Sequence, residues 1–197
     1  MTDSRLIREI KEGNVECYAE LIRRYEKKIL TFVLHMLRQS HVEHMAEDIC
    51  QETFYKAYKS IHSFRDVEAT FSTWLYTIAR NTVLSELRKS RNSDVYLEDT
   101  LQEPIASHER LPEQQLLRTE REVLVRQAIN SLPEKQRSAL ILREYEQMDY
   151  NEIATILDLT VSSVKSLLFR ARQSIKIQLE SYIVDPYLEE AEGMNKR

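Results

Sequence analysis

Glycine is almost absent from this chain: Gly13 and Gly193 are the only two among 197 residues, whereas an average protein uses about 7%. Phosphate-binding loops and dinucleotide-binding turns each need several closely spaced glycines, so the sequence excludes both. Tight strand hairpins favour Asn-Gly or Asp-Gly pairs, and neither pair occurs. The residues that dominate instead are helix formers. The chain is therefore predicted to be all-α.

Apolar periodicity divides the chain into two helical blocks. Hydrophobic residues make up 42% of the sequence, which is enough for one or two cores and excludes wholesale disorder. Apolar side chains recur at three- and four-residue steps in residues 1–91 and 113–184, and this pattern is lost in residues 92–112. We therefore expect two small helical domains, a linker over 92–112 and a C-terminal tail over 185–197.

The first block is predicted to contain four helices. The first ends at Gly13, a residue type that suits a helix C-terminus, and Asn14 can cap the second. Thr70 is expected to open the fourth helix, after a loop that lacks periodicity. The four predicted helices cover residues 3–12, 14–39, 40–60 and 70–89.

Cysteine usage and hydropathy bear on the cellular compartment. The two cysteines, Cys17 and Cys50, are too few for a disulfide framework or a four-cysteine zinc site. No apolar run approaches the roughly 20 residues needed to cross a bilayer, and the charged N-terminus has no signal-peptide core. We expect a cytoplasmic protein whose thiols are reduced and buried.

Charge is distributed unevenly within a net charge of −4. Residues 94–122 hold three basic and eight acidic side chains, a balance of −5, so the linker is acidic. Residues 69–91 carry four cations and one acid, and residues 159–179 carry four cations and no acid. These two basic windows indicate local anion-binding surfaces, although two ordinary solvated helix faces would show the same pattern.

The second block carries the sharper local pattern. Asp149 and Glu152 have the spacing of a capping box, which opens a short helix, and residues 158–160 leave room only for a tight turn. A long basic helix follows. This order is typical of a helix-turn-helix, whose second helix enters the DNA major groove, although a plain helical hairpin also fits. Side chains mostly outside the apolar stripe of that helix are candidate DNA contacts: Lys165, Ser166, Phe169, Arg170 and Arg172.

The first block combines aromatic and basic residues, as single-stranded nucleic acid binding requires. Phe71 and Trp74 are interpreted as core residues. Phe64 lies in a polar loop and is expected to be exposed, where its ring could stack on a base. The candidate contacts to a single strand are Phe64, Arg65, Arg80, Asn81, Arg88 and Lys89.

Two further patterns bear on binding and catalysis. Asp48, Gln51 and Glu52 share one helix face, which is either simply solvated or binds a cationic partner. The histidines lack the Glu-x-x-His pairs of di-iron helical bundles, and no catalytic Ser/His/Asp or Cys/His set stands out. A metal-dependent bundle enzyme is therefore disfavoured, and no catalysis, metal, cofactor or small-molecule substrate is expected.

Three segments, in two regions of the chain, carry a resemblance to a known family. AEDICQETFYKAYKSIHSF with FSTWLYTIARNTVLSELRK resembles the region-two domain of extracytoplasmic-function (ECF) sigma factors of RNA polymerase. SLPEKQRSALILREYEQMDYNEIATILDLTVSSVKSLLFRARQSIK resembles their region-four domain. The resemblance covers nearly all of residues 5–180. It implies a sigma factor that brings core RNA polymerase to specific promoters, reads the minus-thirty-five duplex and melts the minus-ten element.

The resemblance also implies a role for each candidate group. The face around Asp48 matches the family's surface for the polymerase β′ clamp, and the β flap is the other expected contact on core polymerase. The set containing Phe64 matches the minus-ten surface, and the set containing Arg170 matches the minus-thirty-five surface. One position departs from the family, which commonly has Arg where this chain has Leu167, so one contact to DNA is expected to be missing.

Partners follow from the same resemblance. Core RNA polymerase and promoter DNA are expected, together with an anti-sigma factor that can be membrane-bound and hold the chain at the inner face of the membrane. The acidic linker could enter the polymerase channel or act as a plain tether. The alternative function is a free-standing helix-turn-helix regulator that binds duplex DNA without polymerase.

Overall fold

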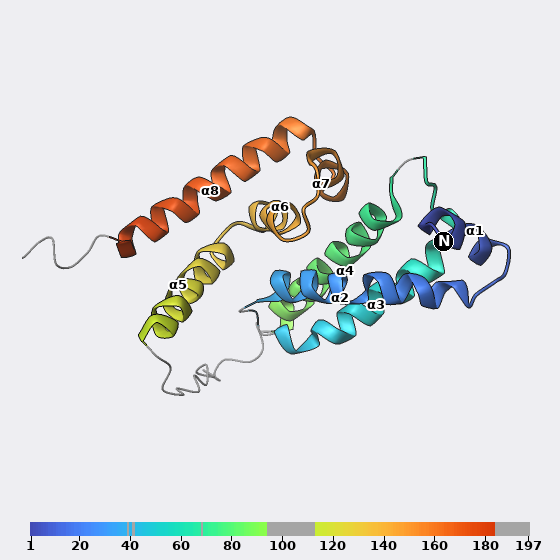
Figure 1. Ribbon diagram of the computed structural model, residues 1–197, viewed down its shortest axis with the longest axis horizontal. Coiled ribbons are helices and arrows are strands. Elements are labelled where there is room, and N and C mark those ends of the chain that lie inside the picture. Colours follow the sequence, from blue (N-terminus) through green and yellow to red (C-terminus); the bar gives the residue numbers. More distant parts are fainter. Residues whose placement is uncertain (39, 41, 68, 94–112, 184–197) are drawn as a thin grey trace, which may run out of the picture.

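Figure 1 shows the computed structural model of the chain, which describes all residues except 39, 41, 68, 94–112 and 184–197. Every element within the described residues is helical, which confirms the all-α prediction. The α-helices are α1 (Asp3–Lys11), α2 (Cys17–Leu37), α3 (Ala46–Ser60), α4 (Phe71–Ser93), α5 (Glu113–Asn130), α6 (Glu134–Glu144), α7 (Tyr150–Leu157) and α8 (Val161–Ile183), with short 3₁₀ helices at Glu43–Met45 and Ile61–Ser63.

Helices α1 to α4 form the first packed unit. Helix α2 packs against α1, α3 and α4, and α3 also packs along α4. The rings of Phe32 in α2 and Tyr76 in α4 meet edge to face at 5.2 Å between centroids, a favoured aromatic geometry. The apolar side chains that face the inside of this unit leave water on folding, and their burial stabilises the unit. The fully buried members include Leu21, Ile29, Phe32, Met36, Ile49, Ile61, Leu75 and Tyr76.

The turn after α1 follows the prediction at Gly13 and contradicts it at Asn14. Gly13 has a φ of +104°, a left-handed conformation that glycine adopts without a steric cost. The Asn14 N–H donates to the Glu9 carbonyl at 2.9 Å and the Gly13 N–H to the Ile10 carbonyl at 3.0 Å, the hydrogen bonds of a Schellman motif. Asn14 does not cap α2, which begins at Cys17 after one further turn.

Two other helix ends differ from the predicted positions. Helix α3 begins at Ala46 rather than at residue 40, because the chain first forms a short 3₁₀ turn. Helix α4 begins where predicted, and the Thr70 hydroxyl accepts the Thr73 N–H at 3.1 Å. It continues to Ser93 rather than ending near residue 89. Its last turn carries no apolar residue, so periodicity could not detect it.

Helices α5 to α8 form the second unit, and its local pattern follows the prediction. The Asp149 carboxylate accepts the N–H groups of Asn151 and Glu152 at 2.7 and 2.9 Å, and the Glu152 carboxylate accepts the Asp149 N–H at 3.0 Å. Asp158 ends α7 in a left-handed conformation, and the Thr160 hydroxyl accepts the Ser163 N–H at the start of α8. These capping contacts produce the predicted helix-turn-helix in α7 and α8.

The predicted linker and tail fall almost entirely outside the described residues. Residues 92 and 93 belong to the end of α4, and residues 94–112 of the linker are outside the described ranges. The same holds for the tail over 185–197.

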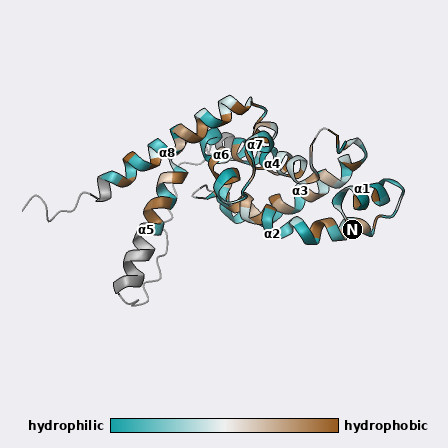
Figure 2. Cartoon of the chain, turned by 45° about the horizontal axis from the view of Figure 1, so that its top comes forward, coloured by the Kyte–Doolittle hydropathy of each residue, from teal (hydrophilic) through white to brown (hydrophobic). Residues whose placement is uncertain are grey.

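The two units pack against each other. Helix α7 lies along α4, and α6 lies against α2, as Figures 1 and 2 show from two directions. The buried residues of both units form one continuous apolar cluster. Sequence patterns did not predict this contact, since it joins residues far apart in the chain.

Candidate DNA and polymerase interfaces

Helix α8 presents one face to the core and the other to solvent. Val164, Leu168 and Ala171 are fully buried along the inner stripe. The five residues predicted to contact duplex DNA are all exposed: Lys165, Ser166, Phe169, Arg170 and Arg172. Phe169 is 64% exposed, which is unusual for a ring on a helix with a well-packed inner face. The structure therefore places these five side chains together on one outward surface.

Ion pairs and ring contacts connect this surface to the neighbouring helices. Arg172 donates to the Glu144 carboxylate at 2.7 Å, and this contact raises the pKa of the guanidinium. The Lys165 ammonium lies 5.7 Å from the centre of the Tyr150 ring, and the Arg143 guanidinium lies 4.9 Å from it. Tyr150 is the first residue of α7 and Arg143 belongs to α6, so the basic surface extends from α8 to the start of α7 and the end of α6.

A groove of about 290 Å³ lies beside this surface. Lys135 from α6 and Ser162, Ser166 and Arg170 from α8 bring hydroxyl and cationic groups to its lining. Leu167 also lines the groove and packs partly against the core. An apolar side chain at this point contributes surface contact and no hydrogen bond to a phosphate or a base.

Phe64 is buried, and the prediction that its ring is exposed is wrong. Only 3% of its surface is exposed. Its ring lies 5.0 Å from the Trp74 ring and 6.0 Å from the Phe71 ring, and the Lys11 ammonium lies 5.9 Å from its centre. The loop sequence around it is polar, but its apolar partners come from α4. No base can stack on the ring in this arrangement.

The loop after Phe64 exposes other residues in its place. Arg65 and Asp66 are exposed, and Val67 is 94% exposed. The Lys11 ammonium donates to the Phe64 carbonyl at 2.6 Å and so fastens the start of this loop to α1. Arg65 is therefore exposed at the surface, while Phe64 supports the loop from beneath.

Arg80, like Phe64, was predicted to contact a single strand and is buried. It is 8% exposed, and its guanidinium makes a bidentate interaction with the Glu134 carboxylate of α6 at 2.9 to 3.1 Å. Such fork-to-carboxylate pairs are among the stronger hydrogen bonds in proteins. In this arrangement Arg80 bridges the two units instead of facing solvent.

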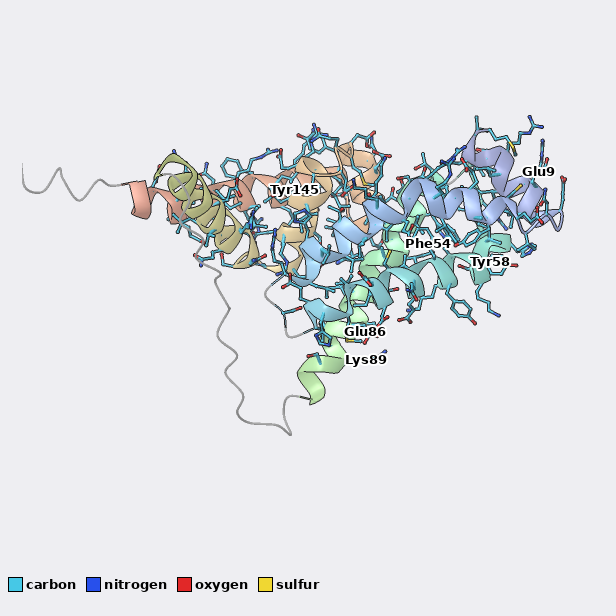
Figure 3. The ribbon with its side chains drawn as sticks, turned by 60° about the horizontal axis from the view of Figure 1, so that its bottom comes forward. Glu9, Phe54, Tyr58, Glu86, Lys89 and Tyr145 are labelled. Carbon is cyan, nitrogen blue, oxygen red and sulfur yellow. The ribbon has the colours of Figure 1, made fainter. Side chains whose placement is uncertain are left out.

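The remaining candidates on α4 are exposed. Asn81, Arg88 and Lys89 all face solvent, with Lys89 paired to Glu86 at 2.5 Å. Figure 3 shows Glu86 and Lys89 on the free C-terminal part of α4, away from the second unit. The predicted single-strand surface on α4 is therefore exposed at Arg88 and Lys89, near the C-terminal end of the helix, and covered at Arg80.

The polar face of α3 is accessible. Asp48 and Gln51 are exposed, and Glu52 is partly exposed and pairs with Lys56 at 2.8 Å. Tyr55, which sequence analysis did not single out, is 61% exposed beside them. Tyr55 lies three residues after Glu52 and outside the apolar stripe, and this spacing could have predicted from the sequence that it shares the polar face. A carboxylate, an amide and an exposed phenol on one face suit a basic partner surface.

The described residues contain neither a membrane-spanning helix nor a metal-binding cluster. None of the helices described is long and apolar enough to cross a membrane. Among the same residues, no three His, Cys, Asp or Glu side chains gather closely enough to hold a metal ion.

Comparisons with known proteins agree with the two-unit layout. Residues 21–93 match the family model "Sigma-70 region 2", and residues 122–175 match "Sigma-70, region 4". Two solved structures share the fold. One is CnrH in complex with the cytosolic domain of CnrY, with a TM-score of 0.66 at 20% identity over 91% of this chain and 97% of that one. The other is the sigma factor RpoE with the anti-sigma factor NepR from Bartonella quintana, with a TM-score of 0.61 at 25% identity over 83% and 96%.

Curated relatives match over almost the whole length. The RNA polymerase sigma-H factor of Pseudomonas aeruginosa is 37% identical, over 96% of this chain and 97% of its own. The ECF RNA polymerase sigma-E factor of Haemophilus influenzae is 35% identical, over 91% and 96%. The corresponding factor of Escherichia coli is 35% identical, over 93% and 97%. With both sigma domains present in order, this chain belongs to the ECF family of RNA polymerase sigma factors.

Proposed function

We propose that the protein directs core RNA polymerase to promoters, with α8 reading the minus-thirty-five duplex, α4 and its preceding loop engaging the minus-ten strand, and α3 docking on the polymerase. The observation that carries this proposal is the row of five exposed polar, cationic and aromatic side chains on the second helix of a helix-turn-helix. Run-off transcription with core polymerase, with and without the protein, on a library of promoters tests it. Duplex binding without any polymerase-dependent transcript would favour the free-standing regulator instead.

The minus-thirty-five surface gives a first prediction, at Arg170. Arg170 is exposed on α8 and is free to reach a base edge in the major groove. Arg170→Ala should weaken binding of the full chain to a duplex selected from a random pool by about 1–3 kcal/mol, if the guanidinium makes a bidentate base contact. Fluorescence anisotropy with the selected duplex measures the loss.

A scrambled duplex is the control for this prediction. Lys165→Ala, which would remove a phosphate contact, should weaken binding to both duplexes to the same extent. An Arg170→Ala variant that loses affinity equally on both duplexes would show that Arg170 anchors the backbone and reads no base.

Docking on core polymerase gives a second prediction, at Asp48. Asp48→Lys reverses the charge of an exposed side chain on the polar face of α3. Affinity for core polymerase should fall about threefold to tenfold at low salt, because exposed charge pairs are individually weak. The loss should shrink at high salt, where such charges are screened.

Glu12→Lys is a matched control for the docking test, since it changes the net charge equally at an exposed site on the end of α1. It should leave the affinity for core polymerase unchanged. Equal affinities of Asp48→Lys and the wild-type protein at low salt would remove α3 from the docking surface.

The minus-ten surface consists of the exposed residues Arg65, Asn81, Arg88 and Lys89, whereas Arg80 is paired with Glu134 of α6. Their cations can neutralise strand phosphates, and the Asn81 amide can bond a base edge. Phe64 supports the loop that carries Arg65. The proposed minus-ten surface therefore lies where the resemblance implies, but Phe64 is a buried support of the loop and not a DNA contact.

An anti-sigma factor is the proposed regulatory partner. Two proteins of similar fold were solved with partner proteins, one of them named as an anti-sigma factor. A cytoplasmic location follows from the proposed work on polymerase and DNA. No reaction is proposed, and the protein acts by binding alone.

A further inference from the structure

Helix α1 has no part in the function proposed above. It precedes residues 21–93, the part of the first unit that matches the family model. Its basic residues Arg5, Arg8 and Lys11 are spaced three residues apart, so they follow one side of the helix. Arg5 and Arg8 are exposed. The helix therefore presents a row of positive charge along this side.

A groove of about 430 Å³ runs beside these cations, and all three line it. Asp66, from the loop after Phe64, is the one acid among the described residues that line the groove. The carboxylate of Asp3 also belongs to α1, but it accepts a hydrogen bond from Arg24 of α2 at 2.8 Å and does not line the groove. Three cations beside one carboxylate give the groove a net positive charge, which favours an anionic ligand.

The groove adjoins the loop that is proposed to engage the minus-ten strand. Helix α1 packs against the 3₁₀ helix Ile61–Ser63, which precedes this loop (Figure 1). The Lys11 ammonium donates to the Phe64 carbonyl at 2.6 Å, so the same side chain lines the groove and holds the loop. Arg65 is exposed, and Asp66 directly after it lines the groove. The proposed strand-binding surface is therefore continuous with the groove.

We propose that this groove binds the phosphates of the single strand that follows the minus-ten element. This inference rests on the proposed function, because it concerns the strand that α4 and the loop are proposed to engage. The DNA upstream of the minus-ten element remains duplex, so a single strand that passes beyond the loop is the part that follows the element. Arginine forks bind phosphate oxygens well, and such contacts do not depend on the base. Helix α1 therefore adds affinity for the open strand whatever its sequence.

The test uses holoenzyme assembled from the full chain and core polymerase. Two fluorescent fragments are made from a promoter that is active in run-off transcription, and both keep the duplex up to the minus-ten element. In the short fragment the minus-ten strand ends with that element. In the long fragment it continues as a single strand for several nucleotides. The two fragments thus differ only in the part of the strand that the groove is proposed to bind.

The double variant Arg5→Gln with Arg8→Gln removes two exposed charges from the groove. It should bind the short fragment as tightly as the wild-type chain and the long fragment about tenfold more weakly at low salt. Each phosphate contact to a single strand contributes about 0.7 to the slope of log affinity against log salt, so two lost contacts should reduce the slope for the long fragment by about 1.4. Fluorescence anisotropy over a salt series measures both effects.

Two further variants separate the groove from a general effect of charge. Arg23→Gln with Lys27→Gln removes the same charge from exposed side chains of α2 that do not line the groove, and it should bind the long fragment as the wild type does. Asp66→Asn removes the carboxylate from the groove. It should bind the long fragment about threefold more tightly and the short fragment equally well, because the groove becomes more positive.

Two results would overturn the proposal. Unchanged binding of the long fragment by the arginine double variant would mean that the strand does not pass α1. An equal loss on both fragments would mean that these arginines act on the minus-ten element or on the polymerase. Run-off transcription of the wild-type chain is measured in parallel. Its absence would defeat the proposed function itself, whereas normal transcription with either result above would defeat only the part assigned to α1.

Discussion

Phe64→Ala is expected to destabilise the protein by about 3–5 kcal/mol, the cost of removing a buried aromatic ring from a packed cluster. The ring is 3% exposed and lies between Phe71, Trp74 and the Lys11 ammonium. Removing it leaves a cavity under the loop and deprives two other aromatic rings of contacts. Urea denaturation followed by circular dichroism measures the loss in the free energy of unfolding.

The neighbouring Val67 provides a matched control in the same loop. Val67 is 94% exposed, so Val67→Ala should change the free energy of unfolding by no more than about 0.5 kcal/mol. An undiminished stability of Phe64→Ala, together with a loss of promoter opening, would mean that the ring faces the DNA and not the core.

Phe64 also shows where sequence reasoning failed. Its neighbours in the chain are polar, and a local pattern therefore indicates an exposed aromatic. Its packing partners lie in the next helix and in α1, more than 50 residues away along the chain in the case of Lys11. Burial of a single loop residue is decided by tertiary contacts, which periodicity within one segment does not record.

The prediction for α7 and α8 succeeded for the opposite reason. The capping box at Asp149 and Glu152 and the cap at Thr160 are local hydrogen bonds, and the inward stripe on α8 is a local period. Such patterns depend only on residues that are close in the sequence, so they can be recognised without knowing the tertiary structure. The exposed positions of Lys165, Phe169 and Arg170 followed from them.

Sequence patterns do not indicate the contact between the two units. Arg80 and Glu134 are 54 residues apart, on opposite sides of a segment without apolar periodicity. Each residue alone looks like an ordinary charge on a helix surface. The packing of α6 and α7 on the first unit brings the acids of the second unit to polar side chains of α4, so Arg80 bridges the two units and does not face solvent.

Adjacent residues on α8 give a second prediction of large effect. Leu168 is 1% exposed and Phe169 is 64% exposed, although both are apolar and directly consecutive. Leu168→Ala should lower the free energy of unfolding by about 2–5 kcal/mol, because it opens a cavity beneath the helix-turn-helix. Duplex binding should then be lost on warming, at the temperature where the second unit unfolds.

Phe169→Ala should show the reverse pattern. Its stability should remain within about 0.5 kcal/mol of the wild type, since the ring makes little contact with the core. Its affinity for the selected minus-thirty-five duplex should fall even at low temperature, where every variant is folded, because an exposed ring on the DNA-facing side can contact a thymine methyl group. Thermal denaturation and fluorescence anisotropy on the same samples separate the two effects. If Phe169→Ala bound the duplex as tightly as the wild-type protein, the exposed ring would have no part in reading DNA, and it would belong instead to a surface that contacts another protein.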